Sequence, residues 1–234
     1  MSSTSNFSRE RAKHYDQQGQ VVLAGHEALY SLTADLMSVV LPESANILVV
    51  GVGTGYELGV IADRLPSSNL VGIDPAESMV DVARGRVREA GLDSQVELKV
   101  GHLGDHDLGR RFDAAVMLGV LHHVQGEGPR KALVQAVADH VKPSGHLLLA
   151  CQCGSWAEHP EFVEVMNRSV SSSELDVEAK SSLLDLMKSA QTDMILPSEK
   201  QVFGFLSEAG FCPPQRYFQS LLFTAWWSRR ETGV

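Results

Sequence analysis

From residue 46 onward, short apolar runs alternate with longer amphipathic segments, and this alternation constrains the fold more than any other feature of the chain. Several runs are almost continuously apolar, as expected for parallel strands covered on both faces. The expected strands are residues 47–51, 70–73, 96–100, 114–118 and 146–151. Alternating strands and helices predict an α/β fold, in which a parallel sheet with right-handed crossovers carries helices on both faces.

Helical patterns fill the spaces between these strands and frame them at both ends. We expect helices at residues 57–65, 76–90, 129–141 and 198–209, and two more within residues 8–40. Residues 142–145 predict a turn, and the polar stretch 169–180 predicts a loop that enters a helix. Residues 215–219 and 221–228 are rich in β-formers and nearly contiguous, which predicts an antiparallel hairpin at a sheet edge.

The composition is that of an ordinary globular protein, with 44% hydrophobic and 21% charged residues among 234. A formal charge of −9 argues against a nucleic-acid partner, because phosphate binding needs clustered Lys and Arg. The sequence shows neither a signal peptide nor an apolar run of about 18 residues, so we expect no membrane span. Cys151, Cys153 and Cys212 fit reduced thiols, and we expect a cytoplasmic protein that is a monomer or homodimer.

Gly51, Val52, Gly53, Thr54 and Gly55 join the first predicted strand to a predicted helix. Glycine allows a positive φ and lets a ligand approach the backbone closely. The free N–H groups at the start of the helix favour a negative group such as a carboxylate or phosphate. The pattern predicts either a nucleotide site or a tight turn that binds nothing.

Asp74 ends the second predicted strand, about 20 residues after the turn, where an acid in nucleotide-binding sheets accepts hydrogen bonds from ribose hydroxyls. The alternative is a helix N-cap, since Asp74 and Pro75 would open the next helix. We favour the ribose. A dinucleotide fingerprint would place its third glycine at position 56, where this chain has Tyr56. That difference argues against NAD and for a ligand with one carboxylate in place of a pyrophosphate.

Four segments in order make the chain resemble the class I S-adenosylmethionine-dependent methyltransferases. Residues 49–55, 72–79, 112–123 and 141–146 look like the first motif of that family, its second motif, its fourth-strand motif and its "LKPGG" turn. Phe7, Ala12, Tyr15 and Asp16 look like an amino-terminal helix that lids the cofactor in many members. Residues 209–211 look like the "AGF" that precedes the last two strands.

The resemblance implies a single methyltransferase domain over residues 1–234, with a Rossmann-like seven-stranded sheet that is mostly parallel and has an antiparallel last strand. Residues 1–45 would form a helical lid, residues 46–153 the cofactor-binding core, and residues 154–234 the acceptor-side helices and hairpin. The implied cofactor is S-adenosyl-L-methionine, and the product is S-adenosyl-L-homocysteine. The implied cofactor-binding residues are Gly51, Val52, Gly53, Thr54, Gly55, Asp74, Pro75, Met79, Gly101, His102, Leu103, Leu118 and Gly119.

The chain departs from that family after the third predicted strand. The family often has Gly-Asp there, with the acid bound to the adenine amino group, whereas this chain has Gly101, His102 and Leu103. His102 would accept the same bond through a neutral ring nitrogen. Alternatively, Asp105 reaches in, or backbone groups near Leu103 suffice alone.

A second resemblance is to the tRNA-uridine modification enzymes that make carboxy-S-adenosylmethionine, whose layout is similar at residues 7–32 and 209–219. That family uses an Arg-Tyr pair in its late helices to hold the extra carboxylate. The corresponding residues 177–194 contain neither Arg nor Tyr, so ordinary S-adenosylmethionine is the better expectation.

Candidate catalytic bases lie just after the fourth predicted strand, because ligands bind outside the carboxyl ends of strands in open α/β sheets. His122 and His123 lie there, and histidine titrates near neutral pH. Tyr15 is a further candidate through the lid helix. The alternative is that one histidine packs beside the cofactor and the other hydrogen-bonds to backbone. The Cys-x-Cys spacing of Cys151 and Cys153 suits a tetrahedral site poorly, so we expect no metal.

Together these features predict a methyltransferase that acts on an oxygen or nitrogen atom of a small-molecule acceptor. Trp156, beyond the fifth predicted strand, is placed to wall the acceptor pocket. Two alternatives stay open. One is a tRNA-modification enzyme of the carboxy-S-adenosylmethionine type, and the other is a non-catalytic module that binds S-adenosylmethionine.

Overall fold

The computed structural model describes residues 9–232, with side chains from Tyr15 onward. Phe7 and the first residues of the predicted lid lie outside the described residues. Within the described part, seven strands form one sheet in the order β3-β2-β1-β4-β5-β7-β6. The strands are β1 (Asn46–Val50), β2 (Asn69–Asp74), β3 (Val96–Val100), β4 (Phe112–Leu118), β5 (Val141–Gln152), β6 (Gln215–Ser220) and β7 (Phe223–Arg229).

Strands β1 to β5 are parallel, and β7 is antiparallel to both of its neighbours, β5 and β6. The prediction of a mostly parallel sheet with an antiparallel last strand is therefore confirmed. Residues 221–222 alone connect β6 to β7, and Leu221 takes a φ of 52° in this tight connection. The predicted hairpin at the sheet edge is confirmed as well, with β6 as the edge strand.

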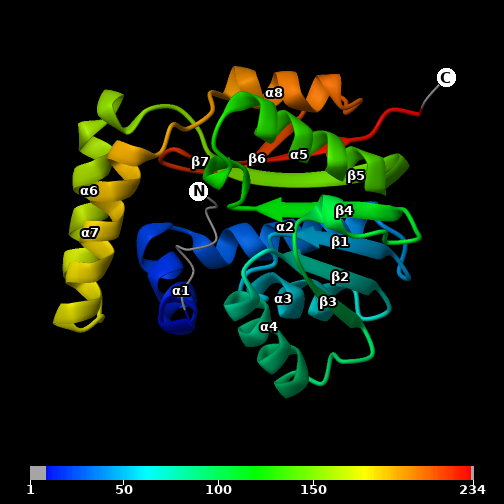
Figure 1. Ribbon diagram of the computed structural model, residues 1–234, viewed down its shortest axis with the longest axis horizontal. Helices are drawn as coiled ribbons and strands as arrows, with labels where there is room; N and C mark the ends of the chain where they lie inside the picture. Colours follow the sequence, from blue (N-terminus) through cyan, green and yellow to red (C-terminus); the bar gives the residue numbers. More distant parts are fainter. Residues whose placement is uncertain (1–8, 233–234) are drawn as a thin grey trace.

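Helices cover both faces of the sheet (Figure 1). One face carries α2 (His26–Val40), α3 (Tyr56–Arg64) and α4 (Glu77–Glu89), and the other carries α5 (Glu127–His140) and α8 (Glu199–Glu208). Leu29, Ile61 and Val87 are buried in the core of the first face, and Val137 and Phe205 in the core of the second. The central strands are therefore mostly apolar, as the nearly continuous runs in the sequence predict.

The strand order places β1 at the point where the chain reverses direction across the sheet, between β2 and β4. Ligands in open α/β sheets bind at such a point, outside the carboxyl ends of the strands. In the register of the sheet, Val50 pairs with Ile73, so the glycine turn after β1 and Asp74 at the end of β2 lie side by side.

The predicted turn at residues 142–145 is wrong, because these residues belong to β5. Ser144 takes a φ of 63°, and its N–H donates to the carbonyl of Arg230 at 3.1 Å. The register between β4 and β5 shifts between Phe112 and Ala114, which accommodates the irregular residues. Residues 142–145 have no register partner on β4, and the backbone bonds of Ser144 and Gly145 to Arg230 hold this bulged segment in place.

The predicted loop at residues 169–180 is wrong over most of its length. Helix α6 (Pro160–Ser172) continues into it, α7 (Val177–Asp193) begins within it, and only residues 173–176 connect the two. Serine hydroxyls do not break α6, because each donates to a carbonyl of the preceding turn; the Ser171 hydroxyl reaches the Asn167 carbonyl at 2.7 Å. Asp176 caps α7 by accepting from the N–H of Ala179 at 2.8 Å.

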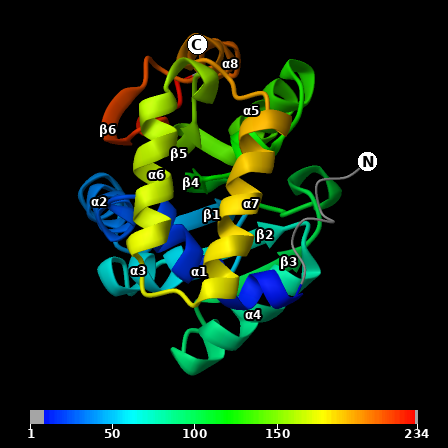
Figure 2. The same cartoon turned by 90° about the vertical axis from the view of Figure 1, so that its left-hand side faces the viewer.

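Helices α6 and α7 stand side by side across the carboxyl end of the sheet, where α1 (Arg9–Val22) also packs (Figures 1 and 2). We call α6 and α7 the cap. Their apolar side chains form a cluster of their own, separate from the two sheet cores. This cap cluster contains Trp156, Met166, Val170, Leu183, Met187 and Leu222. None of the described helices combines the length and the apolar character that crossing a bilayer would require.

Candidate active site

The glycine turn after β1 has the backbone conformation that its glycines predict. Gly51, Gly53 and Gly55 have φ values of +71°, +51° and +75°. The Gly51 N–H donates to the carbonyl of Ile73 at 2.8 Å, which ties the turn to β2. Residues other than glycine rarely adopt these φ values, so the three glycines themselves allow the conformation of the turn.

The three glycines of the turn serve different purposes. A Cβ on Gly51 would lie 2.3 Å from the Cγ2 of Val120, and one on Gly55 would lie 3.0 Å from the Cβ of Ala83. These two glycines are required for close packing. A Cβ on Gly53 would meet nothing nearer than 3.9 Å, so space for a ligand lies above Gly53. This open space against bare backbone fits the predicted cofactor.

Asp74 joins the ends of three neighbouring strands. Its Oδ2 accepts from the N–H of Gly53 at 3.0 Å, its Oδ1 accepts from the N–H of Ala76 at 2.8 Å, and its carbonyl accepts from the N–H of Gly101 at 3.0 Å. Burial raises the pKa of its carboxyl. Ala76, and not Asp74, is the N-cap of α4. A carboxylate offers about four lone pairs, so acceptors remain for ribose hydroxyls.

Pro75 and Met79 follow Asp74 into α4, as predicted for the second motif. Met79 is buried together with Ala76, and Tyr15 from α1 packs against this pair. The structure therefore brings Tyr15 to the cofactor side of the sheet. This position favours a role for Tyr15 in covering the cofactor over a role as the acceptor's base.

Asp16 fastens α1 to the glycine turn, a contact that we call the lid clasp. The hydroxyl of Thr54, a predicted cofactor residue, donates to the Asp16 carboxylate at 2.6 Å. The guanidinium of Arg86 in α4 forms an ion pair with the same carboxylate and donates to the Thr54 hydroxyl at 3.3 Å. The sequence analysis missed Arg86, because nothing in its spacing along α4 connects it with α1.

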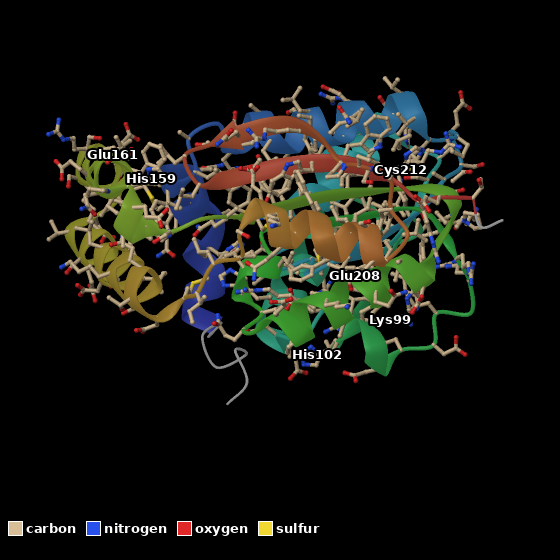
Figure 3. All side chains as sticks on the ribbon, turned by 90° about the horizontal axis from the view of Figure 1, so that it is seen from above. Lys99, His102, His159, Glu161, Glu208 and Cys212 are labelled. Carbon is tan, nitrogen blue, oxygen red and sulfur yellow. The ribbon has the colours of Figure 1, made fainter. Side chains whose placement is uncertain are left out.

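The three groups predicted to bind the adenine lie at the end of β3. His102 is exposed (Figure 3). Its backbone N–H donates to the carboxylate of Asp105 at 2.9 Å, so this carboxylate already has a partner within the same loop. Leu103 is buried. A Cβ on Gly101 would lie 2.8 Å from the Nε2 of His106. His106 was not among the predicted cofactor residues. How the adenine is bound stays a prediction among these groups.

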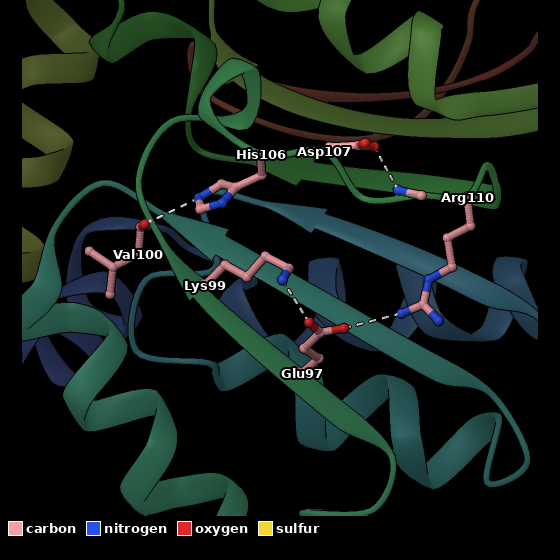
Figure 4. A network of polar contacts seen from close by, with 7 residues as sticks. Glu97, Lys99, Val100, His106, Asp107 and Arg110 are labelled. Carbon is pink, nitrogen blue, oxygen red and sulfur yellow. Dashed lines mark hydrogen bonds and ion pairs between the residues drawn. The ribbon is translucent and has the colours of Figure 1, made fainter.

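His106 belongs to a polar arrangement on the outer part of β3 (Figure 4). Its Nε2 lies 3.1 Å from the carbonyl of Val100. Beside it, Glu97 pairs with Lys99 at 2.7 Å and with Arg110 at 3.3 Å, and the hydrogen bond from Lys99 lowers the pKa of Glu97. These pairs are exposed and stabilise the edge of the sheet only weakly.

The acceptor side begins at Leu118 and Gly119, where β4 ends. The N–H of Gly119 donates to the carbonyl of Ala150 at 2.8 Å, and its φ is +76°. A Cβ on Gly119 would meet no atom within 4 Å, so this backbone too borders open space. Leu118 is buried beneath it. Both predicted positions thus lie at the same edge as the glycine turn.

The rings of His122 and His123 contact each other just beyond Gly119, tilted by 40° with centroids 4.2 Å apart. His122 is buried, and the N–H of Gln152 donates to its Nδ1 at 3.4 Å. Burial, with His123 and Arg130 nearby, holds the pKa of His122 well below its usual range. His122 is thus a neutral ring whose Nδ1 is occupied, while His123 is only half-buried.

At the end of β5, two buried thiols interact electrostatically with the buried guanidinium of Arg130. The Sγ atoms of Cys151 and Cys153 lie 3.5 Å apart, and both thiols are free. Arg130 is 3% exposed and donates to the carbonyl of Ile195 just after α7, while its Nε lacks a partner within residues 9–232. Trp156 packs into the cap cluster above them. The described residues hold no group of three or more His, Cys, Asp or Glu arranged for a metal.

Comparison with known proteins connects this geometry to an enzyme family. Residues 48–147 match a methyltransferase domain. The malonyl-[acyl-carrier protein] O-methyltransferase of Acetivibrio thermocellus is 30% identical over 111 residues, which are 47% of this chain and 36% of that protein. The tRNA (carboxymethyluridine(34)-5-O)-methyltransferase of Arabidopsis thaliana is 28% identical over 128 residues, 55% of this chain and 28% of that protein. This chain thus spans roughly a third of the length of these curated relatives.

The fold has a counterpart among solved structures. Human N-acetylserotonin methyltransferase, in complex with SAM, matches with a TM-score of 0.63 at 17% identity. The match covers 96% of this chain and 57% of that chain. It therefore includes the lid, the sheet and the cap, and shows that this chain has the methyltransferase fold.

Proposed function

We propose that this chain, in which residues 48–147 match a methyltransferase domain, is a class I S-adenosylmethionine-dependent methyltransferase that methylates a small-molecule acceptor on oxygen or nitrogen. The observation that carries the proposal is the open backbone at Gly53 beside the carboxylate of Asp74. Oxygen is the first choice, because a relative is named as an O-methyltransferase. The three free cysteines support a cytoplasmic location, and we expect a monomer or homodimer.

The residues at the ends of β1, β2 and β4 have different roles in this proposal. S-adenosylmethionine, when bound, supplies a methyl group on a sulfonium, which is transferred by in-line displacement. The start of α3, directly after the glycine turn, offers backbone N–H groups to the carboxylate of the methionine portion. Asp74 accepts from the ribose hydroxyls. The cap and the end of β4 hold the acceptor in line with the methyl group, which is the main catalytic contribution for such a good leaving group.

His123 is the better candidate of the two histidines for the general base. The Nδ1 of His122 accepts from the N–H of Gln152, so the proton of this neutral ring lies on Nε2 and no nitrogen is left to take another. His123 lies beside it, half-buried at the carboxyl end of β4. We therefore assign proton removal from the acceptor to His123, and the orientation of the His123 ring to His122.

Isothermal titration and an acceptor screen test this function together. We expect S-adenosylmethionine and S-adenosylhomocysteine to bind, and S-adenosylhomocysteine to be released when the correct acceptor is present. An absence of binding heat with both ligands would refute the cofactor site. Binding without turnover across a broad set of hydroxyl, carboxyl and amine acceptors would favour the non-catalytic module instead.

A second candidate is methylation or modification of tRNA, which the similarity to the Arabidopsis enzyme favours. Two features oppose it. The chain carries a formal charge of −9, and α7 has neither the Arg nor the Tyr expected for carboxy-S-adenosylmethionine. Mass analysis of total tRNA nucleosides after incubation with the protein and S-adenosylmethionine separates the candidates, because only the tRNA enzyme would alter a nucleoside.

A further inference from the structure

Glu57 is a buried carboxyl at the start of α3 that the assignments above do not use. It follows Gly55 by two residues and is 7% exposed. Glu77 occupies the corresponding first turn of α4, at the same edge of the sheet, and is exposed. Glutamate is rarely buried in proteins unless it has an ionic partner. The contrast between Glu57 and Glu77 shows that position in the first turn does not by itself bury a glutamate.

The surroundings of Glu57 are rich in acids. Asp16 from α1 and Asp74 from β2 both act on its carboxyl electrostatically, and Arg86 from α4 opposes them. Arg86 is already paired with Asp16 in the lid clasp. Three carboxyl groups therefore share one guanidinium at the place where the methionine portion of the cofactor is expected.

Aromatic side chains complete the enclosure on the α2 side. Tyr30 is coupled electrostatically to Glu57, and its ring packs with those of His26 and Tyr56 at centroid distances of 4.7 Å and 4.9 Å. Burial lowers the pKa of His26 and raises that of Tyr30, so neither side chain carries a charge near neutral pH. Tyr15 of α1 also acts electrostatically on Tyr30. Among the side chains that the structure describes, from Tyr15 onward, no group on this side supplies a further cation.

We propose that Glu57 is the counter-ion for the ammonium group of the methionine portion of S-adenosylmethionine, and that Glu57 gives up a proton to solvent when the cofactor binds. This inference rests on the proposed cofactor site. In the free protein the Glu57 carboxyl keeps its proton. In the complex it is a carboxylate paired with the ammonium, and the released proton is taken up by buffer.

The electrostatics support this exchange. Burial, with Asp16 and Asp74 adding to it, raises the pKa of Glu57 to about 8, above the pH of most cells. An ammonium brought next to the carboxyl favours its charged form and lowers that pKa. The start of α3 meanwhile offers N–H groups to the cofactor's carboxylate, so the two ends of the zwitterion meet opposite partners.

Titration calorimetry in two buffers tests the proposal. At pH 7, S-adenosylhomocysteine should release close to one proton, seen as a difference in binding heat between phosphate and Tris. 5′-Methylthioadenosine has the nucleoside and the sulfur but no ammonium, and it should release none. Glu57→Gln, which resembles the protonated side chain and should fold normally, should bind S-adenosylhomocysteine roughly 30-fold more weakly and without proton release. Glu77→Gln should behave as the wild type.

The outcomes separate this inference from the proposed function. Binding heats of S-adenosylhomocysteine that are equal in both buffers, together with unchanged affinity in Glu57→Gln, would overturn the role of Glu57 while leaving the cofactor site intact. The same proton release with 5′-methylthioadenosine would also overturn it, because the ammonium would then not be the cause. An absence of heat with every ligand would instead refute the cofactor site on which the inference rests.

Discussion

The two halves of the sheet's carboxyl edge are built in different ways. In the cofactor half, at the ends of β1 and β2, backbone N–H groups make the main contacts: that of Gly51 donates to the carbonyl of Ile73, and that of Gly53 donates to the carboxylate of Asp74. In the acceptor half, at the ends of β4 and β5, the space is closed by the apolar cluster of the cap. Backbone geometry suits a ligand common to a whole family, whereas packed side chains are free to change with the acceptor.

The halves also differ in the ionisable groups that they hold. The cofactor half holds Asp16, Glu57 and Asp74 around Arg86. Among the described residues of the acceptor half, the buried charged side chain is that of Arg130. The cofactor carries a sulfonium and an ammonium against one carboxylate, so an acidic site suits its net positive charge.

The largest effect is expected from the ionisation of Glu57 in the cofactor half, and it can be measured without any ligand. The pKa of Glu57 rises from 4.5 to about 8 in the folded chain, a shift equivalent to about 5 kcal/mol. Between these pH values the folded chain holds a proton that the unfolded chain has lost, so stability falls as pH rises through this window. Glu57→Gln should remove most of that fall, as urea unfolding from pH 5 to pH 9 would measure. Equal pH dependence in both proteins would contradict the assignment.

A cavity in the cap should separate the two halves. Leu183→Ala in α7 removes a side chain that is 3% exposed, at an expected cost of about 3 kcal/mol to the cap. Amide exchange should show faster opening of α6 and α7, turnover should fall, and S-adenosylmethionine affinity should stay within about twofold. The matched variant Leu58→Ala, under the glycine turn in α3, should weaken cofactor binding as well. Equal losses of affinity in both variants would mean that the halves are not independent.

The sequence predicted the cofactor half far better than the acceptor half, and the reason is the range of the interactions. The glycine turn and Asp74 are recognisable because each depends on residues close in sequence and on backbone conformation. Arg86 was missed because its partner Asp16 lies 70 residues away. The cap was misjudged at residues 169–180, where serines suggested a loop but tertiary packing kept a helix.

Removing the Asp74 carboxylate tests how much a side chain contributes to ligand binding in the cofactor half, where most of the contacts come from backbone N–H groups. Asp74→Ala should weaken S-adenosylhomocysteine binding about 100-fold, because ribose hydroxyls lose a charged acceptor and the N–H of Gly53 loses its partner. Asp81→Ala, on the exposed side of α4, is the control and should bind normally. Titration calorimetry measures both, and a loss below threefold in Asp74→Ala would place the ribose elsewhere.

The smallest effect is expected at the boundary of the two halves, where the rings of His122 and His123 contact each other. With an acceptor identified, His123→Ala should lower kcat about tenfold, less than a general base usually contributes, because the sulfonium is already a good leaving group. The pH profile of kcat should lose its acidic limb in that variant, since the limb reports protonation of the base. In His122→Ala the limb should persist, because His122 is a neutral ring whose Nδ1 already accepts from the N–H of Gln152. Loss of the limb in His122→Ala alone would reverse the two roles and make the buried ring the base.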